Sequence, residues 1–156
     1  MKPDIQVIPA LKVVYVRHFG EYGPEIKNAW EKLMSWAKEN VNIDASTMFL
    51  VAYWDDPKST LPEKCRSDAC ITVPEDLKIP ENSDIKTQSL PTGKYAMFLK
   101  SIYKTDEYQK IWEKLCSEDI PNNNLKWDNR PWYEIYHNCP YNILKRTIVD
   151  FCIPIE

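Results

Sequence analysis

The sequence predicts an α+β fold in which two strand-helix-strand-strand units form an antiparallel sheet with two main helices and a pseudo-two-fold cleft. The chain has 156 residues, which is the length of one domain. A motif recurs 82 positions further along, as Trp30-Glu31-Lys32-Leu33 and Trp112-Glu113-Lys114-Leu115. Asp68-Ala69-Cys70-Ile71 maps at the same offset onto Asp150-Phe151-Cys152-Ile153. Because matches in one register indicate a repeat, we expect one domain over residues 1–156, with internal repeats at about 11–74 and 93–154.

The first repeat opens with a β-branched segment, Leu11–Phe19, which is bounded by a proline and a glycine and therefore predicts a strand. Pro24 then occupies the favoured first position of a helix, and apolar residues recur every three or four positions after it. This pattern predicts an amphipathic helix that ends near Asn40. Residues 5–8 form a short lead-in segment before the first strand, and further strands are expected at residues 48–54 and 68–73.

The second repeat has the same order of predicted elements. Thr105 is a suitable N-cap for its helix, and Pro121 is expected to end that helix. The helix carries Trp112 at the position that Trp30 has in the first repeat, and we expect both indoles to pack in the core. Asn138-Cys139-Pro140 is predicted to form a turn. Strands are expected at residues 84–90, 93–100, 132–136 and 147–153.

Composition and charge exclude several classes of function. The chain is 44% hydrophobic and 28% charged with a net charge of −3, as is typical of a globular domain. Lysine and arginine form no cluster, so we expect no direct binding of nucleic acid. The apolar runs are too short to span a membrane, and the first residues lack the apolar stretch of a signal peptide. We therefore expect a cytoplasmic protein without membrane contact.

The cysteines and histidines predict neither a metal site nor a cofactor. The chain has five cysteines and two histidines, with no Cys-x-x-Cys and no paired histidine spacing, which argues against both a zinc site and a disulfide framework. Six tryptophans and nine tyrosines exceed the needs of a core of this size, and such rings often form contact surfaces. A duplicated unit supplies internally the symmetry of a homodimer, so we expect a monomer.

One carboxylate stands out in the predicted strand at residues 132–136. Glutamate is depleted from strands, yet Glu134 lies among aromatic residues and an isoleucine. Period-two alternation puts Trp132, Glu134 and Tyr136 on one face of that strand. Glu134 either faces water or is the one charge of an aromatic pocket. The repeat alignment places Val51 at the equivalent position, and this departure from an apolar residue favours the pocket.

Several segments, taken in order, resemble those of a known family. They are Arg17–Gly23 before a Trp-bearing helix, Asp55-Asp56-Pro57, Pro62–Cys70 and Tyr133–Tyr136. The ordered set resembles the GyrI-like small-molecule-binding family, the effector-binding domain of AraC-type regulators, and it covers nearly the whole chain. The resemblance implies a stand-alone effector-binding domain, without the helix-turn-helix of the regulators and with the duplicated strand-helix-strand-strand fold.

The resemblance also implies a role for Glu134. In multidrug-sensing members an acidic residue of the late strand, which Glu134 matches, binds lipophilic cations in an aromatic pocket. We expect the ligand-binding residues to be Glu134, Trp132, Tyr136, Tyr95 and Trp54. Each ring would contribute roughly 0.5–2 kcal/mol of cation–π attraction. The expected function is the sensing or sequestration of small lipophilic molecules that are cationic or planar.

Two alternatives stay open at this point. Stand-alone members that the chain resembles include hydrolases of strained, cyclopropane-bearing alkylators and DNA gyrase inhibitors. A desolvated Glu134 could act as the catalytic general acid or base of such a hydrolase by activating water, and the sequence offers no separate nucleophile motif. Acidic turns at Asp55-Asp56 and Glu118-Asp119 could instead contact a basic protein partner.

Overall fold

The structure is a computed structural model that describes residues 1–138 and 146–156. The predicted turn at Asn138-Cys139-Pro140 therefore lies partly outside the described residues. The first half contains β1 (Asp4–Ile8), β2 (Leu11–Phe19), α1 (Ile26–Asn40), β3 (Phe49–Tyr53), the short 3-10 helix η1 (Pro62–Lys64) and β4 (Arg66–Thr72). The second half contains β5 (Lys86–Leu90), β6 (Gly93–Ile102), α2 (Glu107–Lys114), the π-helical segment η2 (Leu115–Asp119), α3 (Ile120–Asn122), β7 (Trp132–Tyr136) and β8 (Thr147–Pro154).

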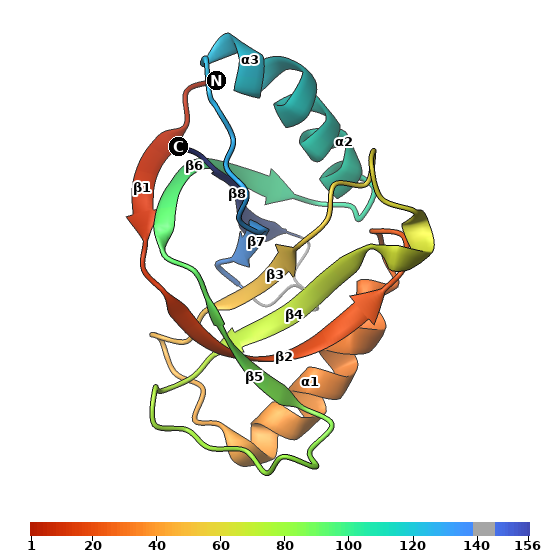
Figure 1. Ribbon diagram of the computed structural model, residues 1–156, viewed down its shortest axis with the longest axis vertical. Helices are drawn as coiled ribbons and strands as arrows, with labels where there is room; N and C mark the ends of the chain where they lie inside the picture. Colours follow the sequence, from red (N-terminus) through yellow and green to blue (C-terminus); the bar gives the residue numbers. More distant parts are fainter. Residues whose placement is uncertain (139–145) are drawn as a thin grey trace.

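All eight strands belong to one antiparallel sheet, as predicted (Figure 1). The strand order is β1-β6-β8-β7-β3-β4-β2-β5. Strands β1 and β2 follow one another almost without a break, and so do β5 and β6. Ile8 lies opposite Gly93 and Leu11 lies opposite Leu90, so the two long stretches pair in a single register. The sheet consequently curls strongly, and its strands form a ring in Figure 1.

The pairings of the two halves correspond strand by strand. β2 pairs with β4 as β6 pairs with β8, and β3 pairs with β4 as β7 pairs with β8. The halves meet where β3 pairs with β7. An origin of the halves in an internal duplication stays a prediction.

The two faces of the sheet carry separate apolar clusters. One cluster combines strand residues with residues of the helices, including Trp30 and Leu33 of α1 and Leu115 of η2. The other cluster is built from strand residues alone, and every one of the eight strands contributes to it. Both main helices therefore cover the same face, while the opposite face of the curled sheet packs against itself.

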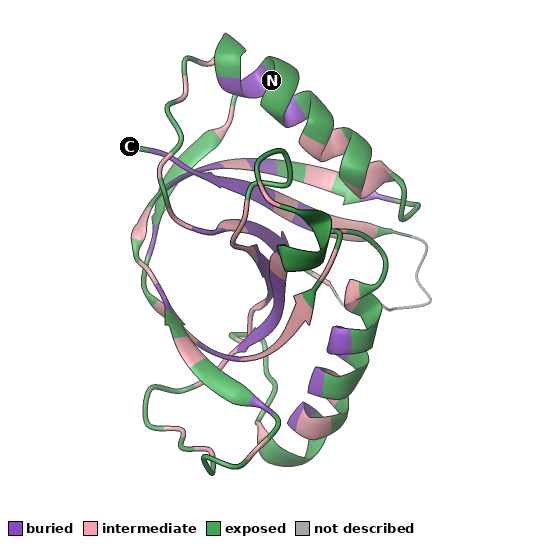
Figure 2. Cartoon of the chain, turned by 45° about the vertical axis from the view of Figure 1, so that its right-hand side comes forward, coloured by how far each residue is buried: buried purple, intermediate pink, exposed green. Residues whose placement is uncertain are grey.

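The two main helices differ in regularity and in burial. α1 runs without interruption for 15 residues and buries Ala29, Trp30, Leu33 and Ala37. α2 has eight residues, none of them buried, and it continues into η2 and α3. Figure 2 shows this contrast as buried turns along α1 and only half-buried or exposed turns along α2.

The ends of the second helix differ from the sequence prediction. α2 begins at Glu107 with Asp106 rather than Thr105 at the N-cap, and no side chain caps it. Pro121 does not end the helical region, because it lies in the first turn of α3. The proline therefore stands within a continuous helical stretch, directly after the π-helical segment η2.

Candidate functional site

Glu134 lies at the middle of β7, on the face of the sheet that the helices cover. Its neighbours across the two adjacent strands are Val51 on β3 and Phe151 on β8, both fully buried. The Glu134 residue is only 3% exposed. A central strand bordered by apolar residues on both sides therefore carries a buried carboxyl group. This burial excludes the alternative in which Glu134 faces water.

Two donors hold the carboxylate, one on each oxygen. The indole Nε1 of Trp112 on α2 donates to Oε2 at 2.6 Å, and the Tyr136 hydroxyl donates to Oε1 at 2.5 Å. The Tyr53 hydroxyl on β3 gives a further hydrogen-bonding interaction with Glu134. Hydrogen bonds to a charged acceptor are short and strong, so this arrangement favours one fixed orientation of the side chain.

Burial dominates the ionisation of this group. Desolvation raises the pKa of Glu134, while the hydrogen bonds from Tyr136, Trp112 and Tyr53 act in the opposite direction and offset part of that rise. Desolvation together with the nearby Glu134 charge also raises the pKa of Tyr136 well above its ordinary value. The tyrosine hydroxyl therefore stays a proton donor.

Within residues 1–138 and 146–156, the carboxylate of Glu134 has no cationic partner. The ion pairs between described residues include no lysine, arginine or histidine at this acid. An ionised carboxylate buried without a cation is strongly destabilised relative to water, even when neutral donors surround it. A cation brought by a ligand would relieve this destabilisation.

Aromatic rings surround Glu134 on the helix-covered face. Trp112 lies 5.0 Å from Phe151, 5.7 Å from Trp132 and 6.1 Å from Tyr53, measured between ring centroids. Trp132 in turn lies 6.3 Å from Trp127, which is 55% exposed and brings the cluster to the surface. Tyr136 also meets the rings of Trp30 and Tyr108. We call the set Tyr53, Tyr108, Trp112, Trp127, Trp132, Tyr136 and Phe151 the aromatic cluster.

The structure brings together three of the five predicted site residues. Trp132, Glu134 and Tyr136 share one face of β7, as the alternation predicts. Tyr95 and Trp54 belong to the opposite face, so their predicted grouping with Glu134 is wrong. Tyr95 stacks on Tyr133 at 5.0 Å between ring centroids and donates its hydroxyl to the Pro131 carbonyl at 2.8 Å.

Trp54 is hydrogen-bonded to a second buried acid, Asp68. Its Nε1 donates to Asp68 Oδ2 at 2.8 Å, and Gln88 Nε2 donates to the same oxygen at 2.8 Å. Arg17 pairs with both carboxylate oxygens of Asp68, at 2.8 and 2.9 Å. Asp68 is fully buried but, unlike Glu134, it has a cation of its own.

Sequence reasoning missed Trp112 and Tyr53 as neighbours of Glu134. The sequence predicts core packing for Trp112, and the structure agrees only in part, because the indole is half-buried and donates its N–H to the carboxylate. The sequence does contain a signal that identifies Tyr53 as a neighbour of Glu134. Val51 is the repeat equivalent of Glu134, and Tyr53 lies two residues further on the same strand, whereas Trp54 has the opposite parity.

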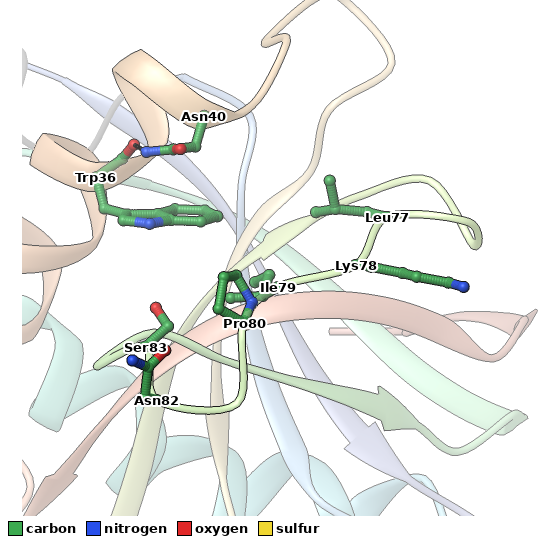
Figure 3. A pocket seen from close by; sticks show the side chains of 8 residues that line it. All are labelled: Trp36, Asn40, Leu77, Lys78, Ile79, Pro80, Asn82 and Ser83. Carbon is green, nitrogen blue, oxygen red and sulfur yellow. Dashed lines mark hydrogen bonds between the residues drawn. The ribbon is translucent and has the colours of Figure 1, made fainter.

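Two open pockets lie elsewhere, between the end of α1 and the segment that follows β4 (Figure 3). Their volumes are about 290 and 390 Å³, and they share Asn40 and Leu77. Trp36 lines the smaller pocket with Pro80, and neither pocket includes Glu134. Neither combines a buried charge with aromatic walls, so Glu134 and the aromatic cluster form the stronger candidate site.

Residues 1–138 and 146–156 contain no group of three or more His, Cys, Asp or Glu side chains arranged to hold a metal ion. Within the same ranges, every helix is too short or too polar to cross a lipid bilayer.

Comparisons with known proteins agree with this fold. The family model described as the GyrI-like small molecule binding domain matches residues 1–156. YosT, an SPbeta prophage-derived Bacillus subtilis protein whose name describes transcriptional regulation, is 30% identical over 100% of both chains. A DNA gyrase inhibitor of Serratia proteamaculans is 30% identical over 83% of this chain and 82% of its own. The structure of SAV2435 bound to tetraphenylphosphonium matches with a TM-score of 0.66 and 14% identity, over 100% of this chain and 94% of that one.

Proposed function

This chain belongs to the GyrI-like small-molecule-binding family, and from that premise we propose that it captures lipophilic, planar cations at Glu134, in drug sensing or sequestration. The aromatic cluster would form the walls of the site and the carboxylate its anionic centre.

One observation carries this proposal: Glu134 is buried and has no cation among the described residues. Natural proteins rarely bury an ionised carboxylate unless it is paired, and Asp68 of this same sheet shows the ordinary solution. A cationic ligand would complete the pair at Glu134. The rings of Trp112, Trp132 and Tyr53 would add stacking and cation–π attraction, which favours flat and apolar cations over inorganic ones.

The relatives support a small organic ligand of this kind. The structural neighbour SAV2435 was solved with tetraphenylphosphonium, a lipophilic cation. Its likeness to this chain concerns the fold, so the ligand class for this chain rests on Glu134 and its aromatic surroundings.

A calorimetric titration tests the proposal. Cationic dyes and neutral analogues of similar size are titrated into the wild-type protein, Glu134→Gln and Glu113→Gln. Glu113 is an exposed acid beside Trp112 in the sequence, so its variant removes the same charge without touching the site. We expect the cations to bind the wild type and Glu113→Gln alike and Glu134→Gln at least tenfold more weakly, since a desolvated ion pair is lost. Equal affinity of the cations for wild type and Glu134→Gln would show that Glu134 does not contribute to cation binding.

Hydrolysis is a second candidate, favoured by the contact between Glu134 and Tyr136. A carboxylate whose pKa is raised by burial is a competent general base toward water, and a tyrosine hydroxyl at 2.5 Å could polarise the attacked group. The test is incubation with a cyclopropane-bearing alkylator, followed by chromatography of the products. Ring opening by the wild type that is absent with Glu134→Gln would establish catalysis, whereas unchanged substrate would leave capture as the function.

Inhibition of DNA gyrase is a third candidate, favoured by the relative of that name at 30% identity. The predicted acidic turns offer less free charge than expected, because Asp55 pairs with Arg66 at 3.0 Å and Asp119 is buried. A supercoiling assay with purified gyrase tests this role directly. Unaltered supercoiling at a saturating concentration of the chain would exclude it.

A further inference from the structure

Trp112 directs its indole N–H at the Glu134 carboxylate. This donor is the N–H of a flat bicyclic aromatic, held edge-on to Phe151 with an interplanar angle of 74° and tilted by 53° against Trp132. Its 2.6 Å bond to Oε2 is a full hydrogen bond to a desolvated acceptor. The site therefore already holds a planar aromatic N–H group of its own.

Of the donors Trp112 and Tyr136, Trp112 belongs to the less buried element. Tyr136 belongs to the central strand β7 and is 7% exposed. Trp112 belongs to α2, which has no buried residue and runs directly into the π-helical segment η2. Elements with few buried side chains open locally at low free energy, and π-helical turns are frequent at functional sites.

The repeat-equivalent tryptophan gives a contrast within the same molecule. Trp30 in α1 is 1% exposed and lies within a helix that buries three further residues. The residue opposite Glu134, at the position corresponding to it, is the apolar Val51. The less buried of the two equivalent indoles thus occurs on the half that carries the buried acid.

We propose that the Trp112 indole is an internal stand-in for the ligand, and that the site prefers planar heteroaromatic cations with a ring N–H over cations that have none. The inference rests on the proposed function. A ligand that reaches Glu134 displaces Trp112, and Oε2 then loses the hydrogen bond from the indole N–H. A ring N–H replaces that hydrogen bond in kind, whereas a cation without N–H leaves a buried acceptor unsatisfied.

The expected size of the preference follows from that missing hydrogen bond. Both kinds of cation pair with the same negative charge and stack on the same rings, so these contributions cancel between matched ligands. A buried acceptor left without a donor weakens binding by roughly five- to 150-fold.

The test compares acridine orange with its ring-N-methylated derivative on the full chain at neutral pH. Protonated acridine orange has its only N–H on the ring nitrogen, because both exocyclic amines are dimethylated. The two dyes thus share charge, flatness and nearly the same size. Fluorescence titration is expected to show acridine orange binding about tenfold or more tightly to the wild type. Equal or tighter binding of the N-methylated dye overturns the inference.

Trp112→Phe tests whether the ligand displaces the Trp112 indole or packs against it as a wall of the site. The variant keeps a ring but removes the competing N–H, so both dyes are expected to bind more tightly while their ratio stays unchanged. Weaker binding of both dyes would mean that Trp112 is part of the wall, and would overturn the stand-in role. Trp36→Phe, at the separate pocket near the end of α1, is the matched control and should leave both affinities unchanged. Tighter binding by Trp36→Phe as well would indicate general loosening and would also count against the inference.

Glu134→Gln distinguishes the failure of this inference from the failure of the proposed function. If the variant binds both dyes as tightly as the wild type does, the proposed function fails. If binding needs Glu134 but the two dyes bind equally, only the preference for an N–H fails.

Discussion

Asp68 and Glu134 are both buried carboxylates of the same sheet, and they are held in opposite ways. Asp68, on the face without helices, pairs with Arg17 through both oxygens and accepts further bonds from Trp54 and Gln88. Glu134, on the helix-covered face, accepts bonds from neutral donors alone among the described residues. The first acid has its charge balanced within the fold, and the second does not.

The difference separates an acid whose charge is balanced by a cation from an acid that has no such cation among the described residues. Removing Arg17 would leave Asp68 as an isolated buried charge, so the folded state should lose stability. Removing the charge of Glu134 removes the free-energy cost of burying an unpaired carboxylate, so the folded state should gain stability. Substitutions at the two sites should therefore shift stability in opposite directions.

The largest effect is expected from Arg17→Met. Asp68 would then be a fully buried carboxylate without a cation, which should lower the free energy of unfolding by about 3–5 kcal/mol. Urea denaturation at neutral pH measures the loss. Arg66→Met is the matched control, because its pair with Asp55 is more exposed to solvent and should contribute at most about 1 kcal/mol. Similar losses for the two variants would contradict the view of Asp68 as a structural acid.

A smaller effect is expected from Tyr136→Phe. The variant removes the hydroxyl that donates to Glu134 Oε1, and a hydrogen bond to a charged group contributes roughly 1.5–3 kcal/mol. The pKa of Glu134 should rise further, since this hydrogen bond lowers it. Denaturation measures the stability, and a carboxyl-specific NMR titration measures the pKa. Tyr103→Phe, which alters an exposed ring, should change neither quantity, and a pKa of Glu134 that falls in Tyr136→Phe would refute the assignment.

The smallest effect, and one of opposite sign, is expected from Glu134→Gln. Because the pKa of Glu134 is raised on folding, wild-type stability should fall as the pH rises from the unfolded value near 4.5 through the folded value. The variant lacks this loss and should be more stable than the wild type at neutral pH, by about 1.4 kcal/mol for each unit of the rise. Denaturation of both proteins across this pH range measures the difference, and a difference independent of pH would show that Glu134 is not an unbalanced acid.

Much of the fold could be predicted because its signals are local. The strand over Leu11–Phe19 and the helix ending at Asn40 occur where β-branched runs and apolar spacing predict them. Pro121 shows the limit of such signals, since a proline can end one helical stretch or begin another. The π-helical segment before it has no sequence pattern of its own and depends on how α2 packs.

The site could be predicted along its own strand but not across strands. Alternation within β7 correctly groups Trp132 with Glu134, because both side chains belong to one strand. Tyr95 and Trp54 suit a cation by their chemistry, but no sequence pattern gives the register that links their strands to β7, and both belong to the other face. Trp112 approaches Glu134 from a helix, and only tertiary packing decides which strand residue its indole meets.

The pairing of Val51 with Glu134 has a consequence for stoichiometry. If two identical subunits formed this sheet, the central position would hold two acids or none. Two carboxyls directly opposite one another would have Cβ atoms about 4.5–5.5 Å apart and would share a proton instead of both ionising. A lone negative charge at the meeting point of matching halves requires halves that can differ, as they can within one polypeptide. A chain that captures cations at Glu134, as proposed above, should accordingly bind a single monocation, which need have no symmetry of its own.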